Sequence, residues 1–295
     1  MRKLVGLTAA ILICVNLAAC GNQPQNPANT DALPSAQPTA TPTANPSEEA
    51  SIESSLIYDA NGIKVTAKSL SSGGLFGPEL NVLIENNTDK NLTIQAQKVS
   101  VNDFMVSTIF SAEVPAGKKA NDAITFEKGD IEAAGIEKIA SIEFFLNIFE
   151  TDTWDDFAYS EKIAIPTSLA DSYTQPIDRS GKTVFDEGGV TVISKGIIHE
   201  GFLGPELILF IENNLDKNIT VQAGSVSVNG FAVDPVFSSD VLSGKKIIDE
   251  MTIMSTDMEK NEIETISEIE LSLIIFDSET FDDIYKPGPI TLQFD

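Results

Sequence analysis

The chain has 295 residues, enough for two domains of ordinary size, and 42% of them are hydrophobic, which is typical of a folded protein. Acidic residues outnumber basic ones by 44 to 19, so the formal net charge is −25 and the surface repels nucleic-acid phosphates. We therefore exclude nucleic acid as a partner. The two cysteines are Cys14 and Cys20, so the sequence beyond them holds no disulfide, thiol nucleophile or thiolate metal site.

The first twenty residues predict export. Residues 1–3 contain the basic pair Arg2 and Lys3, residues 4–17 are mostly apolar, and the run Leu-Ala-Ala-Cys ends at Cys20. The apolar stretch is shorter than the ~20 residues that cross a bilayer, so a cleaved signal peptide is favoured over a transmembrane helix.

The run Leu-Ala-Ala-Cys resembles the lipobox of bacterial lipoproteins. The resemblance implies a lipoprotein signal peptide over residues 1–19 and lipid attachment (palmitate) at Cys20. It also implies anchoring to the extracytoplasmic face of the cell membrane. The alternative is an ordinary secretory signal cleaved near Ala19, with Cys20 unmodified.

Residues 20–50 predict a disordered linker that follows the lipidated cysteine. They are mostly Asn, Pro, Thr, Ala, Ser and Gln, with almost no large apolar side chain. Such a composition buries too little apolar surface to offset the entropy of ordering the chain. We expect this tether to hold the following domains away from the membrane.

The rest of the chain is an internal duplication. A shift of 127 residues aligns residues 57–165 with residues 184–292 without a gap, and the run Gly-Pro-Glu-Leu at 77–80 recurs at 204–207. A period this long indicates tandem domains, because solenoid repeats have periods of about 20–50 residues. We therefore expect repeat 1, an interdomain linker and repeat 2 at 51–166, 167–182 and 183–295.

Apolar and polar residues alternate with a period of two in both repeats, which predicts β-strands. The clearest alternation covers 142–148 and recurs at 269–275. Residues 79–85 and 92–96 are joined by turn-forming residues and predict a β-hairpin. Further strands are expected at 62–68, 98–103, 121–126 and 162–166. One short helix per repeat is expected to begin near Asp130 or Asp257.

About seven short strands with little helix in roughly 110 residues is typical of a sandwich. The predicted fold class is all-β. We expect two tandem immunoglobulin-like antiparallel β-sandwich domains, each with one short helix, after the signal peptide and the disordered tether.

Longer runs carry a family resemblance. Repeat 1 contains GPELNVLIENNTDKNLTIQAQKVSVN, then GKK, GIEKIASIEF and DTWDD. These runs resemble an uncharacterised tandem immunoglobulin-like β-domain of Gram-positive surface lipoproteins. The resemblance implies a fold and a location but no activity. Repeat 2 departs from the pattern, with Phe281 in place of Trp154 and Glu262 in place of Gly135, which puts a shared ligand pocket at those positions in doubt.

Each repeat has carboxylates clustered after its longest strand. They lie at the same offset in both repeats: Glu150, Asp152, Asp155, Asp156, Asp277, Glu279, Asp282 and Asp283. Calcium takes six to eight oxygen ligands, and clustered carboxylates supply several. The pattern lacks the glycine of an EF-hand loop, and acidic turns are common in so acidic a chain. Two interpretations stay open: a calcium site, or the solvated loop that we favour, with no other cofactor indicated.

A glycine-rich apolar loop recurs in both repeats. It carries Leu75 and Phe76 in repeat 1, and Phe202 and Leu203 in repeat 2. As exposed side chains on a hinged loop, they would bind a protein or carbohydrate partner. The favoured alternative is a turn whose Leu and Phe cover the end of the core, because the order of the pair is inverted while its apolar character stays.

A pair of lysines also recurs on a turn, as Lys118 and Lys119 in repeat 1 and as Lys245 and Lys246 in repeat 2. In so acidic a molecule the pair could dock an anionic ligand. The favoured interpretation is a turn with solvated lysines.

Enzyme chemistry is poorly supported. The single histidine, His199, has Ser72 as its counterpart, so no catalytic base is shared by the repeats. We predict a membrane-anchored, extracytoplasmic, non-catalytic binding module with a protein or cell-wall ligand. Duplication favours binding, because two tethered weak sites gain avidity. The alternatives are a structural spacer of the cell envelope and calcium-dependent binding through the acidic loops.

Overall fold

The computed structural model describes residues 49–294, which fall within one compact unit, Ser47–Asp295. The predicted signal peptide, Cys20 and almost all of the tether lie outside the described residues. Within the described range, no helix has the length and apolar character needed to cross a membrane.

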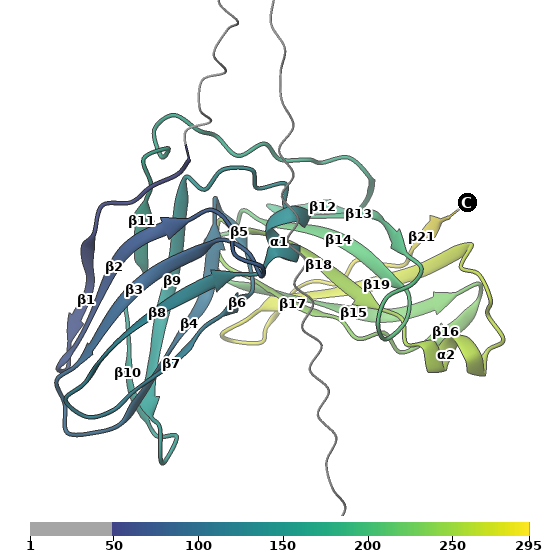
Figure 1. The fold of residues 1–295 in the computed structure, drawn as a ribbon. Coiled ribbons are helices and arrows are strands. Elements are labelled where there is room, and N and C mark those ends of the chain that lie inside the picture. The colour runs from purple at the N-terminus through teal and green to yellow at the C-terminus, as the bar shows by residue number, and fades with distance from the viewer. Residues whose placement is uncertain (1–48, 295) are drawn as a thin grey trace, which may run out of the picture. The chain divides into compact units, whose positions relative to one another are not determined.

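Repeat 1 is built from two antiparallel sheets that share one core (Figure 1). The first sheet has the order β1-β2-β3-β8-β6. Its strands are β1 (Ser55–Ala60), β2 (Ile63–Ser71), β3 (Glu79–Asn86), β8 (Lys119–Phe126) and β6 (Thr108–Ile109). In the second sheet β4 pairs with β9, while β5 and β7 pair with β4, and β10 and β11 pair with β9. These strands are β4 (Leu92–Val101), β5 (Phe104–Met105), β7 (Ser111–Val114), β9 (Ser141–Glu150), β10 (Asp156–Tyr159) and β11 (Ile163–Pro166).

Repeat 2 follows the same plan. One sheet segment has the order β12-β13-β14-β18, with β12 (Lys182–Glu187), β13 (Val190–Ile198), β14 (Glu206–Asn213) and β18 (Lys246–Thr252). In the other sheet β15 pairs with β19, and four short strands flank them. These strands are β15 (Ile219–Val228), β16 (Phe231–Val233), β17 (Ser238–Val241), β19 (Glu268–Asp277), β20 (Asp283–Tyr285) and β21 (Ile290–Gln293).

The all-β, immunoglobulin-like sandwich class is confirmed in both repeats. The alternation at 142–148 forms β9, whose Ile142, Phe144, Leu146 and Ile148 side chains are fully buried. Burying each such side chain contributes about 1.5–3 kcal/mol. The short helices are also confirmed, as α1 (Lys128–Ala133) and α2 (Ser255–Lys260), and each begins two residues before the predicted aspartate.

The predicted hairpin over 79–96 is wrong, because β3 and β4 belong to different sheets. The buried side chain of Asn86 fixes this corner. Its Nδ2 donates to the carbonyls of Lys90 and Val114, both at 2.8 Å, and its Oδ1 accepts the Thr88 N–H at 3.0 Å. Asn213 makes the equivalent bonds in repeat 2. Turn-forming residues suit a crossover between sheets as well as a hairpin, so the repeated Asn-Asn run has a structural role.

The strands predicted at 92–96 and 98–103 are one strand, β4, rather than two. Lys98 has a φ of 53°, and the register against β9 shifts between Gln97 and Ser100. A β-bulge of this kind bends a strand without ending its pairing. The break that the sequence suggests is therefore a bend within a continuous strand.

The two repeats are joined by a short ladder and a buried lysine. β5 and β18 pair in parallel at Phe104 and Lys246. The Lys245 side chain is only 9% exposed and lies 2.7 Å from the carboxylates of both Asp103 and Glu143. The solvated interpretation is therefore wrong for Lys245, whereas its counterpart Lys118 is exposed. The domain bounds themselves stay a prediction.

Glu143 titrates under two opposing influences at this junction. Burial raises the pKa of its carboxyl, but hydrogen bonds from Lys245 and Lys162 outweigh burial and hold that pKa below its usual value of 4.5. Glu143 is therefore charged at neutral pH and bridges lysines from both repeats.

Candidate functional site

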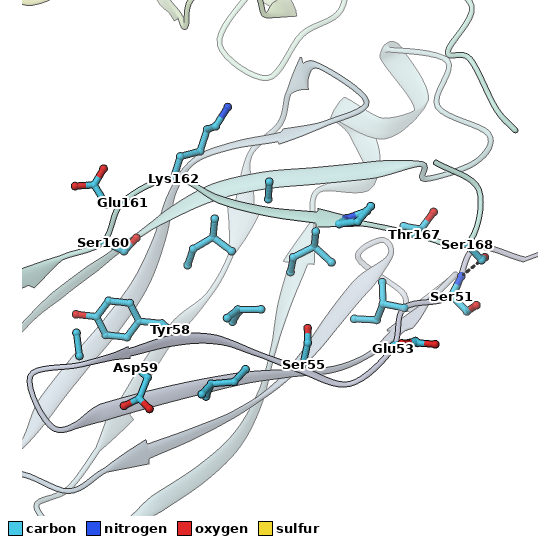
Figure 2. A pocket seen from close by; sticks show the side chains of 18 residues that line it. Ser51, Glu53, Ser55, Tyr58, Asp59, Ser160, Glu161, Lys162, Thr167 and Ser168 are labelled. Atoms are coloured by element: carbon cyan, nitrogen blue, oxygen red, sulfur yellow. Dashed lines mark hydrogen bonds between the residues drawn. The ribbon is translucent and has the colours of Figure 1, made fainter. Parts of the chain in front are cut away.

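A groove of about 1000 Å³ runs along repeat 1 where the two sheets of the sandwich part at their edges (Figure 2). Residues 51–60, including all of β1, line one side. Residues 160–168, including all of β11, line the other. Elongated cavities of several hundred Å³ with apolar walls and a few polar groups are typical ligand sites.

Both walls of the groove are edge strands. β1 stands at the end of its sheet and pairs with β2, whereas β11 pairs with β9. Within residues 49–294 neither strand has a second partner, so each keeps one backbone edge unpaired. One end of the groove is closed by two hydrogen bonds (Figure 2). The Ser168 N–H donates to the Ser51 carbonyl at 2.8 Å, and the Ser51 N–H donates to the Ser168 hydroxyl at 3.1 Å.

The floor of the groove is apolar. Ile163 and Ile165 on β11 are buried, and Ile57 and Tyr58 on β1 pack partly against the same core. Leu56 on β1 is 53% exposed beside them. A ligand entering here would cover apolar surface that water now contacts, which favours binding by roughly 25 cal/mol per Å².

The rim of the groove carries excess negative charge. Lys162 pairs with Glu143 at 3.2 Å, and Asp59 pairs with Lys64 at 3.1 Å. Glu53 and Glu161 line the groove without an ion pair to any residue that the structure describes. The rim therefore favours a cationic ligand over an anionic one.

Repeat 2 provides an internal comparison, because the cavity at its equivalent seam is smaller. Tyr285 lies with its ring centre 5.1 Å from that of Phe185 and covers the turn at Gly188, and Phe294 packs against the core. The 127-residue shift puts Ala158 of repeat 1 at the position of Tyr285 and, two residues past the aligned range, Thr167 at the position of Phe294. Thr167 lines the end of the groove, but its side chain is buried and its hydroxyl donates to the Ile139 carbonyl at 2.7 Å. A smaller cavity of about 400 Å³ is left beside Phe294.

The amino-acid pattern did not predict β1, the strand that forms one wall of this site. Residues 55–60 show no clean alternation, and the register of β1 against β2 shifts between Leu56 and Tyr58. The usable signal was the recurrence of an apolar pair, Ile57 and Tyr58, at residues 184–185.

The acidic-loop residues lie outside the groove. Glu150 forms an ion pair with Lys90, and Asp152 accepts a hydrogen bond from the Asn91 side chain at 3.3 Å. Most of the other loop carboxylates are exposed, namely Asp155, Asp156, Glu279, Asp282 and Asp283. In residues 49–294 no group of three or more His, Cys, Asp or Glu side chains is arranged to hold a metal ion.

Asp277 is held by its own loop. The Glu279 and Thr280 N–H groups donate to it at 2.9 and 3.1 Å, and Lys217 lies 3.1 Å away. These hydrogen bonds and the lysine hold the pKa of Asp277 below its usual range. Calcium binding at the acidic loops stays a prediction.

The apolar loop residues are exposed, so the interpretation that they cover the core is wrong. Leu75 is 85% exposed and Phe202 is 97% exposed, with Phe76 and Leu203 at 62% and 49%. At the end of this loop Gly77 has a φ of +136°, and a Cβ there would lie 2.0 Å from the Phe126 carbonyl oxygen. This close approach requires glycine at the position. A partner-binding role for the four side chains stays a prediction, and they do not line the groove.

Comparison with known proteins assigns no family. No family model matches the chain, and no curated protein matches it.

Among solved structures the chain is similar to the YadV chaperone, at 10% identity and a TM-score of 0.23, covering 73% of this chain and 92% of that one. It is also similar to a chain of the Salmonella enterica SafA pilin in complex with the SafB chaperone. That match has 12% identity and a TM-score of 0.24, covering 80% of this chain and 98% of that one. A third match is a Porphyromonas gingivalis protein of unknown function, at 8% identity and a TM-score of 0.20, covering 83% and 96%. TM-scores this low transfer neither a function nor a site.

Proposed function

We propose that this chain is a lipid-anchored, extracytoplasmic, non-catalytic binding module whose ligand enters the groove between β1 and β11. The observation that carries the proposal is the groove of about 1000 Å³ in repeat 1, against a cavity of about 400 Å³ at the equivalent seam of repeat 2. The groove combines unpaired strand edges with apolar side chains, and a ligand would cover both.

The location rests on the sequence. The apolar segment followed by Leu-Ala-Ala-Cys supports export and lipid attachment at Cys20, and the resemblance to Gram-positive surface lipoproteins agrees with both. The Pro- and Thr-rich tether gives the binding module reach from the membrane. The ligand is then a protein or cell-wall component at the cell surface.

A structural spacer is the second candidate. It is favoured by the ion pairs that the buried Lys245 of repeat 2 makes with Asp103 and Glu143 of repeat 1. The linker also packs, since Arg179 donates to Glu212 at 2.8 Å and Gln175 accepts a hydrogen bond from Asn102 at 3.0 Å. A spacer role accounts for these contacts between the repeats, but it does not account for the groove.

Retention on cell envelopes distinguishes the two candidates. The probe is the chain from residue 20 with Cys20→Ser, incubated with envelope fragments of the producing bacterium and then pelleted. The filled variant carries Ala164→Tyr, which places a ring on an exposed groove residue of β11. We expect retention of the parent chain and at least a tenfold loss in the filled variant. Equal retention of both would refute binding in the groove.

A matched control separates the groove from the exposed loop. Leu75→Ser with Phe76→Ser removes the apolar loop side chains of repeat 1 and leaves the groove residues unchanged. We expect this control to be retained as well as the parent chain. Thermal melting verifies that each variant is folded.

A further inference from the structure

We infer that the groove takes an extended polypeptide strand with alternating apolar and basic side chains, which pairs with the free edge of β1. This inference rests on the proposed function and names the ligand class. It combines three properties of one site: an unpaired strand edge, an apolar floor and an acidic rim.

The backbone of β1 offers hydrogen-bonding groups to an added strand. β1 ends its sheet and pairs with β2, so the N–H and C=O groups on its other edge have no strand partner within residues 49–294. An added strand satisfies such groups through main-chain hydrogen bonds, whatever its side chains are. β1 has six residues, so it offers about 20 Å of edge.

The side chains on the floor of the groove determine what an added strand carries at alternate positions. Successive side chains of an added strand point to opposite faces. Those on one face would meet the floor formed by Ile57, Ile163 and Ile165, where an apolar side chain gains from burial. Those on the other face would remain in solvent. The ligand is therefore apolar at every second position.

The negative charge on the groove rim favours basic side chains at the solvent-facing positions of the ligand. Glu53 and Glu161 form no ion pair with any described residue, while Lys162 is matched by Glu143. The chain as a whole has a net charge of −25. Basic outward side chains complement this rim, whereas an anionic wall polymer would be repelled.

Repeat 2 defines the negative counterpart. There Tyr285 packs on Phe185 of β12 and Phe294 packs against the core, and the cavity at the equivalent seam is about 400 Å³ instead of about 1000 Å³. Repeat 2 should therefore not take a strand at this seam. Replacing the two aromatic residues with their counterparts, Tyr285→Ala and Phe294→Thr, should create a second site.

Fluorescence anisotropy with synthetic peptides tests the inference. The probe is a labelled octapeptide of four Val-Lys units, titrated with the chain from residue 20 carrying Cys20→Ser. The control peptide has the same composition in blocks, Val-Val-Lys-Lys twice, so its charge is equal but its alternation is lost. We expect the alternating peptide to bind at least tenfold more tightly than the blocked one. A second control has N-methyl groups at alternate amides, and it should lose at least tenfold.

The protein variants complete the test. Ala164→Tyr places a ring on an exposed groove residue of β11 and should weaken binding of the alternating peptide at least tenfold. If that variant does not fold, Ser55→Tyr places a ring on an exposed groove residue of β1 and should have the same effect. The opened variant of repeat 2 should bind two peptides per chain.

Equal binding of the alternating and blocked peptides, or binding that N-methylation leaves unchanged, would overturn strand addition. If envelope retention still depended on the groove, the proposed function would stand and the ligand would be of another class. If retention were also independent of the groove, the proposed function would fail as well.

Discussion

Replacing Lys245 with methionine tests whether the contact between the repeats contributes to stability. The lysine ammonium is 2.7 Å from both Asp103 and Glu143, and its side chain is 9% exposed. Methionine keeps a similar apolar stem and removes the charge. The change therefore isolates the two ion pairs from the packing around them.

The magnitude follows from the burial of the three groups. Breaking a fully buried ion pair costs about 3–5 kcal/mol, whereas an exposed pair contributes about 0–1 kcal/mol. Here the Lys245 side chain is buried, but those of Asp103 and Glu143 are 56% and 23% exposed, and Glu143 keeps Lys162 at 3.2 Å. Water and the second lysine therefore compensate part of the loss. We expect Lys245→Met to cost about 2 kcal/mol.

Urea unfolding at pH 7, followed by circular dichroism, measures this cost as a lower midpoint at unchanged slope. Lys118→Met is the matched control, because Lys118 occupies the same turn in repeat 1 and is exposed. Exposed substitutions of this kind usually stay within about 0.5 kcal/mol. Similar costs for the two variants would refute the stabilising role of Lys245.

The pH dependence has a defined sign. The pKa of Glu143 in the folded chain lies below its usual value of 4.5. Its contribution to stability is therefore present above about pH 4.5 and is lost as the pH falls through the folded-state pKa. The cost of Lys245→Met should shrink below pH 4.5, and a constant cost down to pH 3 would contradict this assignment.

Three further predictions concern other parts of the chain. Asn213→Ala should lower the free energy of unfolding by about 3 kcal/mol in urea titrations, because it leaves one buried carbonyl, one partly buried carbonyl and one partly buried N–H without their partner. Asp249→Asn should stabilise the fold at pH 7, because burial and the nearby Asp130 raise the pKa of Asp249. The gain should vanish as the pH falls below 3.8, the usual value for this carboxyl. Millimolar calcium should leave the melting temperature unchanged, because Lys90 and Lys217 already neutralise the loop carboxylates Glu150 and Asp277.

Each of these predictions has an outcome that contradicts it. A loss below 1 kcal/mol for Asn213→Ala would mean that water replaces the corner hydrogen bonds. Destabilisation by Asp249→Asn at pH 7 would mean that the charged carboxylate makes a favourable contact. A calcium-dependent rise in melting temperature, abolished by Asp155→Asn with Asp156→Asn, would restore the calcium site.

The sequence by itself determined the fold class, because alternation is a local property. Side chains on a strand point to opposite faces in turn, so Ile142, Phe144, Leu146 and Ile148 had to share one face whatever they packed against. The duplication was equally visible, since it needs no structure to detect. Both results depend on patterns within short stretches or on identity between distant ones.

The alternation of apolar and polar residues does not predict which strands pair with each other. The turn-forming residues after β3 suit a hairpin and a crossover between sheets alike. The choice was made by the Asn86 side chain, which bonds the carbonyl of Val114 at a separation of 28 residues. A partner so far along the chain has no signature in the turn itself.

The candidate site was decided by tertiary structure alone. The groove exists because β1 and β11, separated by about a hundred residues, border one seam. In the sequence β1 has no clear alternation, and nothing in either strand marks the other as its neighbour. Lys245 and Lys118 likewise stand in matching Gly-Lys-Lys turns, yet one is buried and the other is exposed. Local sequence determines which face a side chain takes, whereas only the packed sheets determine what that face meets.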